Sequence, residues 1–130
     1  MKKVLFVSSG DSPSGVIAYY FASHLGKNKV QAYHVGAFPT ADVNIKLKEL
    51  VDELNYETDL QEMKRKCVVP GMSFDYLIHT GIGAGSMKPL FPAQNVIYWN
   101  LPDCRDMRFA DMRTVRKAIE VKVKELVKSI

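Results

Sequence analysis

The first sixteen residues constrain the fold of this chain more than any other segment. Val4–Val7 is a short apolar run that predicts a buried strand, and it leads into a loop of small residues, Ser8 to Ser12. Pro13 then stands where a helix is expected to begin, because proline at the first helical position loses no hydrogen bond, and Ser12 is suited to cap that helix. A loop placed in this way directs several backbone N–H groups inward at the positive end of the helix dipole. The segment therefore predicts a site for a phosphate-like anion.

The rest of the sequence alternates between segments typical of strands and segments typical of helices. Apolar runs predict three further strands, at Lys29–Val35, Tyr76–Ile78 and Val96–Trp99. Apolar residues at helical spacing, together with capping patterns, predict helices at Pro13–Leu25, Ala41–Leu54, residues 58–66 and Asp106–Lys128. Strands that alternate with helices predict an α/β domain with a four-stranded parallel sheet and helices on both of its faces.

The composition limits the other possibilities. A chain of 130 residues, 47% of them hydrophobic, predicts one domain that spans residues 1–130 and buries a real core. No apolar run reaches the length of a membrane span, so we expect no membrane association. Cys67 and Cys104 lie far apart and have no metal-ligand spacing, which indicates free thiols in a reducing cytoplasm. We expect no metal and no cofactor.

The net charge of +4 is concentrated near the C-terminus, where most basic residues belong to one predicted helix: Arg105, Arg108, Arg113, Arg116, Lys117, Lys122, Lys124 and Lys128. This pattern is typical of a solvated helix face, and nucleic-acid binding is the less favoured interpretation because no aromatic residues are interleaved with the charges.

Four further patterns follow the first loop along the chain: Phe21–Gly26, Val35–Thr40, Thr80–Pro92 and Trp99–Asp103. Taken in this order with the loop, they resemble the low-molecular-weight protein tyrosine phosphatases and the related thioredoxin-coupled arsenate reductases. The signature of that family is a strand that ends in cysteine, then five residues, an arginine and a serine or threonine. The resemblance covers nearly the whole chain and implies a sheet with strand order 2-1-3-4.

The resemblance also assigns family positions to individual residues. It puts the nucleophilic cysteine at Ser8, the anion-clamping arginine at Ser14, the loop asparagine at Asp11 and the final serine or threonine at Gly15. The general-acid aspartate falls at Asp103. The implied strand order brings three segments around one mouth, where the order of the strands reverses: Ser8–Gly15, Gly81–Lys88 and Asp103–Arg105.

The departures from the family pattern determine the expected function. A serine hydroxyl is too weakly acidic to replace the cysteine thiolate, and serine nucleophiles usually need an adjacent base. Loss of the arginine removes charge-assisted hydrogen bonds worth about 1.5–3 kcal/mol each, and Asp11 adds a negative charge that opposes a dianion. We therefore expect a catalytically degenerate relative, a pseudoenzyme. We expect the surface at the former active site to bind an anion weakly, or to bind a protein partner. The loop residues that would form this surface are Ser9, Gly10, Asp11, Ser12, Ser14 and Gly15.

Other interpretations remain open. The loop residues also fit a turn that only caps the helix. An active phosphatase or arsenate-reductase-like enzyme would use Ser8 or Asp11 for phosphoryl transfer, and a sugar-transport IIB-like component ranks third. Arg105 or Lys88 would then substitute for the missing cation. His79, near the end of the third strand, is expected to be a buried, hydrogen-bonded structural residue. The sequence predicts neither the oligomeric state nor the physiological ligand.

Overall fold

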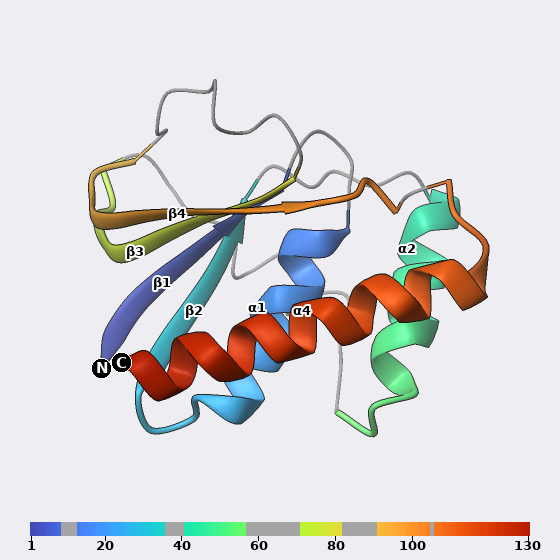
Figure 1. The fold of residues 1–130 in the computed structure, drawn as a ribbon, viewed down its shortest axis with the longest axis horizontal. Helices are drawn as coiled ribbons and strands as arrows, with labels where there is room; N and C mark the ends of the chain where they lie inside the picture. Colours follow the sequence, from blue (N-terminus) through green and yellow to red (C-terminus); the bar gives the residue numbers. More distant parts are fainter. Residues whose placement is uncertain (9–12, 36–40, 57–70, 82–90, 105) are drawn as a thin grey trace.

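The computed structural model describes residues 1–8, 13–35, 41–56, 71–81, 91–104 and 106–130, and for residues 41–45 it describes the backbone alone. The elements follow one another in the order β1 (Lys2–Val7), α1 (Ser14–Leu25), β2 (Val30–Val35), α2 (Ala41–Asp52), β3 (Phe74–Gly81), β4 (Ala93–Leu101) and α4 (Phe109–Ser129) (Figure 1).

The four strands form one parallel sheet in the order β2-β1-β3-β4, as the sequence resemblance predicts. Val4 of β1 lies opposite Ala32 of β2 and Tyr76 of β3. The order of the strands therefore reverses beside β1, because the chain adds β2 on one side of it and β3 on the other. Ligand sites of open α/β sheets lie at such a point, beyond the carboxyl ends of the strands, and Ser8 follows the carboxyl end of β1.

Alternate residues of β1 enter different apolar clusters. Val4 and Phe6 join the larger cluster, in which they pack with residues of α1, α2 and α4. Leu5 and Val7 join a smaller cluster with Leu77 on the other face. The three described helices lie together on the face of the larger cluster (Figure 1). The helix predicted at residues 58–66 lies outside the described residues.

The ends of the elements differ from the predicted ones for local reasons. β1, β3 and β4 extend further than their apolar runs, since main-chain pairing continues where side chains become polar. α2 ends at Asp52, and Asn55 follows it with a left-handed φ of 60°. α4 begins at Phe109 instead of residue 106, because Arg108 still has an extended backbone, with φ −67° and ψ 157°.

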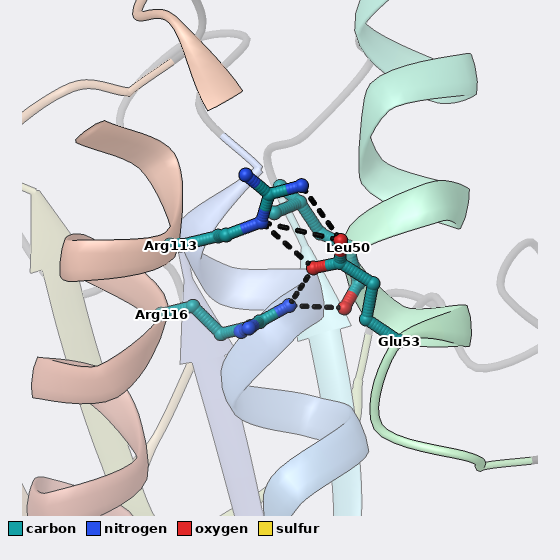
Figure 2. Close-up of polar contacts among 4 residues, drawn as sticks. All are labelled: Leu50, Glu53, Arg113 and Arg116. Atoms are coloured by element: carbon teal, nitrogen blue, oxygen red, sulfur yellow. Dashed lines mark hydrogen bonds and ion pairs between the residues drawn. The ribbon is translucent and has the colours of Figure 1, made fainter. Parts of the chain in front are cut away.

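The basic residues of α4 pair with carboxylates. Both Arg113 and Arg116 bind Glu53 just after α2, each with an N···O distance of 2.7 Å (Figure 2). Arg116 also donates to the carbonyl of Leu50, at 2.7 Å, in the last turn of α2, where a cation is favourable. These hydrogen bonds lower the pKa of the Glu53 carboxyl to about 2. The cluster ties α4 to the end of α2.

Two further searches cover the described residues only. None of the described helices combines the length and hydropathy needed to cross a bilayer. Within the same ranges, no group of histidine, cysteine, aspartate and glutamate side chains is arranged to hold a metal ion.

Candidate functional site

Ser8 occupies the start of the candidate loop, directly after β1. Its backbone N–H donates to the carbonyl of Val35 at 3.1 Å, which continues the pairing of β1 with β2 by one residue. Its side-chain Oγ accepts a hydrogen bond from the backbone N–H of Gly15, in the first turn of α1, at 2.8 Å. Only 4% of the Ser8 surface is exposed. The residue at the family's nucleophile position is thus buried and bound to the helix that follows it.

The start of α1 differs from the expected capping arrangement. The helix begins at Ser14, and Pro13 is the capping residue, with no side-chain hydrogen bond of its own. The predicted cap, Ser12, lies outside the described residues. One N–H of the first turn is satisfied by Ser8, seven residues before Gly15 in sequence. The residue that follows β1 therefore supplies a hydrogen bond that a neighbouring cap residue ordinarily supplies.

Gly15 permits the close approach of Ser8 to the helix. A Cβ atom built on Gly15 would fall well inside the van der Waals radius of Ser8 Oγ, and 3.4 Å from both the Cβ and the backbone nitrogen of Ser8. A side chain at this position would therefore displace the hydroxyl or the first turn of α1. Glycine at residue 15 therefore permits the hydrogen bond from its own N–H to Ser8 Oγ.

Ser14, at the family's arginine position, faces the sheet. Its hydroxyl lies 2.8 Å from that of Thr80 in β3, and Thr80 in turn donates to the carbonyl of Val7 at 3.1 Å. Both hydroxyl residues are fully buried. The chain of bonds joins the first turn of α1 to β3 and to the end of β1. Ser14 is held by structural hydrogen bonds in the interior, where it offers no positive charge.

Thr80 is the residue that sequence reasoning missed. It was considered only as the first member of the segment Thr80–Pro92, and no local motif marks it. The position of Thr80 in the chain is what could have indicated its role. It lies at the carboxyl end of the strand next to β1, where a hydroxyl is close to the loop and to the neighbouring strand.

His79 precedes Thr80 and lies on the opposite face of β3. It is 1% exposed, its register partner in β1 is Val7, and its ring stacks on that of Tyr98 with centroids 4.9 Å apart and planes within 6°. Neither ring nitrogen has a hydrogen-bond partner in the part of the chain that the structure describes. Burial lowers the pKa of the imidazole, so the ring is held in its neutral form. The expected burial is confirmed, and the expected hydrogen bond is wrong for the described residues.

Asp103, the family's general-acid position, is exposed just beyond β4. The strand is irregular before it. Its register shifts opposite His79–Gly81, and Asn100 has a left-handed φ of 51°. Leu101 and Cys104, on either side of Asp103, are buried and anchor the loop. The remaining predicted site residues, Ser9, Gly10, Asp11, Ser12, Lys88 and Arg105, lie outside the described residues.

Apart from the exposed Asp103, the described part of the site is a set of neutral hydroxyls and amides at the carboxyl edge of the sheet. No described histidine or carboxylate hydrogen-bonds Ser8 Oγ, so no base is in place there to take its proton. The arrangement supports hydrogen bonding. It does not supply an activated nucleophile from the residues that the structure describes.

Solved structures of other proteins share this architecture. An arsenate reductase in its oxidized state superposes with a TM-score of 0.74 at 23% sequence identity, over 99% of this chain and 98% of that one. The fold is that of the arsenate reductases. An arsenate reductase in the phosphate binding state gives a TM-score of 0.64 at 22% identity, over 100% and 99% of the two chains. A mutant of YwlE from Bacillus subtilis gives 0.66 at 12% identity, over 99% and 98%.

Sequence comparisons add nothing to this assignment, because no protein-family model and no curated protein match the chain. The arsenate-reductase fold nevertheless confirms the resemblance to arsenate reductases and low-molecular-weight phosphatases at the level of architecture, including the strand order.

Proposed function

We propose that this protein is a catalytically degenerate relative of the arsenate reductases and low-molecular-weight phosphatases. In this proposal, it binds a phosphate-like oxyanion through the backbone of Ser8–Gly15 and does not turn it over. The observation that carries the proposal is the hydrogen bond from the Gly15 N–H to Ser8 Oγ, because it gives the nucleophile position a structural role.

The family's covalent chemistry needs a thiolate, and Ser8 provides a hydroxyl. A hydroxyl becomes a nucleophile when a base removes its proton, and the bond that Ser8 makes is one in which its oxygen accepts. Ser14, which the resemblance places at the arginine position, supplies no positive charge for an anion. Its side chain is buried and hydrogen-bonded to Thr80. Both changes remove side chains on which the family's covalent chemistry depends.

A loop that ends at a helix N-terminus holds an oxyanion through backbone N–H groups, whatever side chains it carries. One arsenate reductase of the same fold is in a phosphate binding state. We expect weaker binding here. No guanidinium stands at residue 14, the Gly15 N–H is already bonded to Ser8, and the Asp11 carboxylate repels a dianion.

The test is an amide NMR titration with phosphate, sulfate and arsenate, combined with assays of phosphate-ester hydrolysis and arsenate reduction. We expect saturable shifts confined to the amides of residues 9–16, with no turnover in either assay. The variant Asp11→Asn should bind the same anions more tightly, because it removes one negative charge at nearly constant shape.

Two results would overturn parts of this proposal. Turnover that is abolished in Ser8→Ala would make the protein an enzyme with an atypical serine site. Unchanged amide signals, in both the wild type and Asp11→Asn, would show that the loop only caps α1 and would direct attention to a protein partner at the same mouth.

A further inference from the structure

β4 forms one edge of the sheet and leaves half of its main-chain groups unused. Within the described sheet it pairs with β3 alone, and its nine residues make it the longest of the four strands. The N–H and C=O groups on its outer side therefore have no strand to bind among the described residues. An unpaired edge of this kind is a template for pairing with a strand from another chain.

The sequence of β4 lacks the devices that ordinarily protect an edge. Between Ala93 and Leu101 there is no charged residue and no proline, and the strand is rich in β-branched and aromatic residues. Val96 and Tyr98, two residues apart on one face, are 37% and 39% exposed. The opposite edge is different, since no side chain of β2 is exposed. Of the two edge strands of the described sheet, β4 is therefore the one that carries exposed apolar side chains.

We propose that β4 pairs antiparallel with β4 of a second copy of this chain, which joins two sheets into one across a two-fold axis. An axis through Ile97 places Val96 opposite the second copy's Tyr98, and Tyr98 opposite the second copy's Val96. One register thereby covers both exposed apolar side chains of both copies, through a cross-strand aromatic and β-branched pair. The pairing is self-complementary, because each copy supplies both members of the valine and tyrosine pair. An unrelated strand would present matching side chains at these positions only by chance.

The absence of charged residues in β4 also favours a second copy of this chain as the partner. Two identical charged strands would repel each other, whereas two copies of β4 bring no like charges together. The irregularity at the carboxyl end of β4, where Asn100 has φ 51°, limits the pairing to the regular part of the strand. The association therefore closes at a dimer, because a two-fold interface uses the same edge of both copies. It leaves the Ser8–Gly15 loop unused and is independent of the proposed anion site.

The experiment compares the solution mass of three proteins by sedimentation velocity and light scattering over a range of micromolar concentrations. The wild type should reach twice the chain mass of 14.7 kDa. Val96→Lys should stay at the mass of one chain, because it places a charge on the edge. The matched control is Val121→Lys, which adds the same charge at an apolar residue of α4 that is 45% exposed, and it should dimerise like the wild type. Far-ultraviolet circular dichroism checks that both variants are folded.

Hydrogen exchange on the wild type gives a second measurement that needs no variant. Amides of β4 that face outward should exchange more slowly at concentrations where the dimer forms, and amides of α4 should not change. The proposal is overturned by a wild type that remains at one chain mass, by assemblies larger than a dimer, or by a dimer that Val121→Lys dissociates and Val96→Lys does not. A dimer whose β4 amides show no added protection overturns it as well.

Discussion

The side-chain oxygen of Ser8 accepts a hydrogen bond from the backbone N–H of Gly15 at 2.8 Å. This contact links the first residue of the candidate loop to the first turn of the helix after it. It also gives the serine an acceptor role, so that its oxygen stabilises the start of α1. The residue pair therefore couples the stability of the helix start to the residue that follows β1.

The first prediction concerns this pair. Gly15→Ala should lower the free energy of unfolding by about 1–3 kcal/mol, because the added methyl group overlaps the Ser8 hydroxyl. Ser8→Ala should lower it by about 1–2 kcal/mol, since it leaves a buried N–H without its acceptor. The double variant should lose less free energy of unfolding than the two single variants lose together, because removal of the Ser8 hydroxyl also removes its overlap with the added methyl group. Chemical denaturation of the four proteins measures the coupling. Strictly additive losses would show that the two residues do not interact.

The second prediction tests the buried hydroxyl chain. Thr80→Val keeps the shape of the side chain and removes the oxygen that binds both Ser14 and the carbonyl of Val7, so it should cost about 1–3 kcal/mol of stability. The matched control is Thr114→Val on the exposed surface of α4, which should change stability by less than about 0.5 kcal/mol. Thermal or urea unfolding distinguishes the two. Equal effects at both positions would mean that β-branched shape alone matters at residue 80.

These contacts show which parts of the molecule the sequence predicts and which it does not. The strand Val4–Val7, the helix after Pro13 and the alternation of strands and helices are local patterns, and the structure confirms them. The partner of Ser14 is 66 residues away, at Thr80, and the carbonyl that Arg116 binds, at Leu50, is also 66 residues away. Pairs of this kind depend on how strands and helices pack, and no local motif encodes them.

The function of individual loop residues is harder to predict for a related reason. Ser12 fits the local rule for a helix cap, and Ser8 does not, because it precedes the helix by too many residues. The fold brings Ser8 beside Gly15 only because the strand and the helix meet at the same edge of the sheet. The sequence resemblance assigns Ser8 the position of a nucleophile, and in the structure its oxygen accepts a hydrogen bond from the first turn of α1.

The third prediction concerns pH and Glu53. Its carboxyl has a pKa of about 2 in the folded protein, below the ordinary 4.5, because Arg113 and Arg116 hydrogen-bond the ionised form. The stabilisation is therefore complete above about pH 4.5 and is lost as the pH falls toward 2. Glu53→Gln should lower the free energy of unfolding near neutral pH. It should also reduce the loss of that free energy as the pH falls from about 4.5 toward 2. The exposed Glu125→Gln of α4 is the control, and an acid profile of Glu53→Gln that matches the control would contradict this assignment. Denaturant midpoints across the pH range measure it.

The fourth prediction concerns His79, whose pKa is lowered by burial, so the sign of its pH dependence can be stated. The unfolded chain takes up a proton near pH 6.5 while the folded protein still excludes it, so stability is complete above this pH and falls as the pH drops below it. His79→Phe keeps an aromatic ring stacked on Tyr98 and removes the titration, and it should therefore flatten the unfolding profile below pH 6.5. The control, His24→Phe, changes an exposed histidine that stacks on Tyr56 and should keep the wild-type slope. A slope that persists in His79→Phe and disappears in His24→Phe would show that the buried ring is not the group that couples folding to protons.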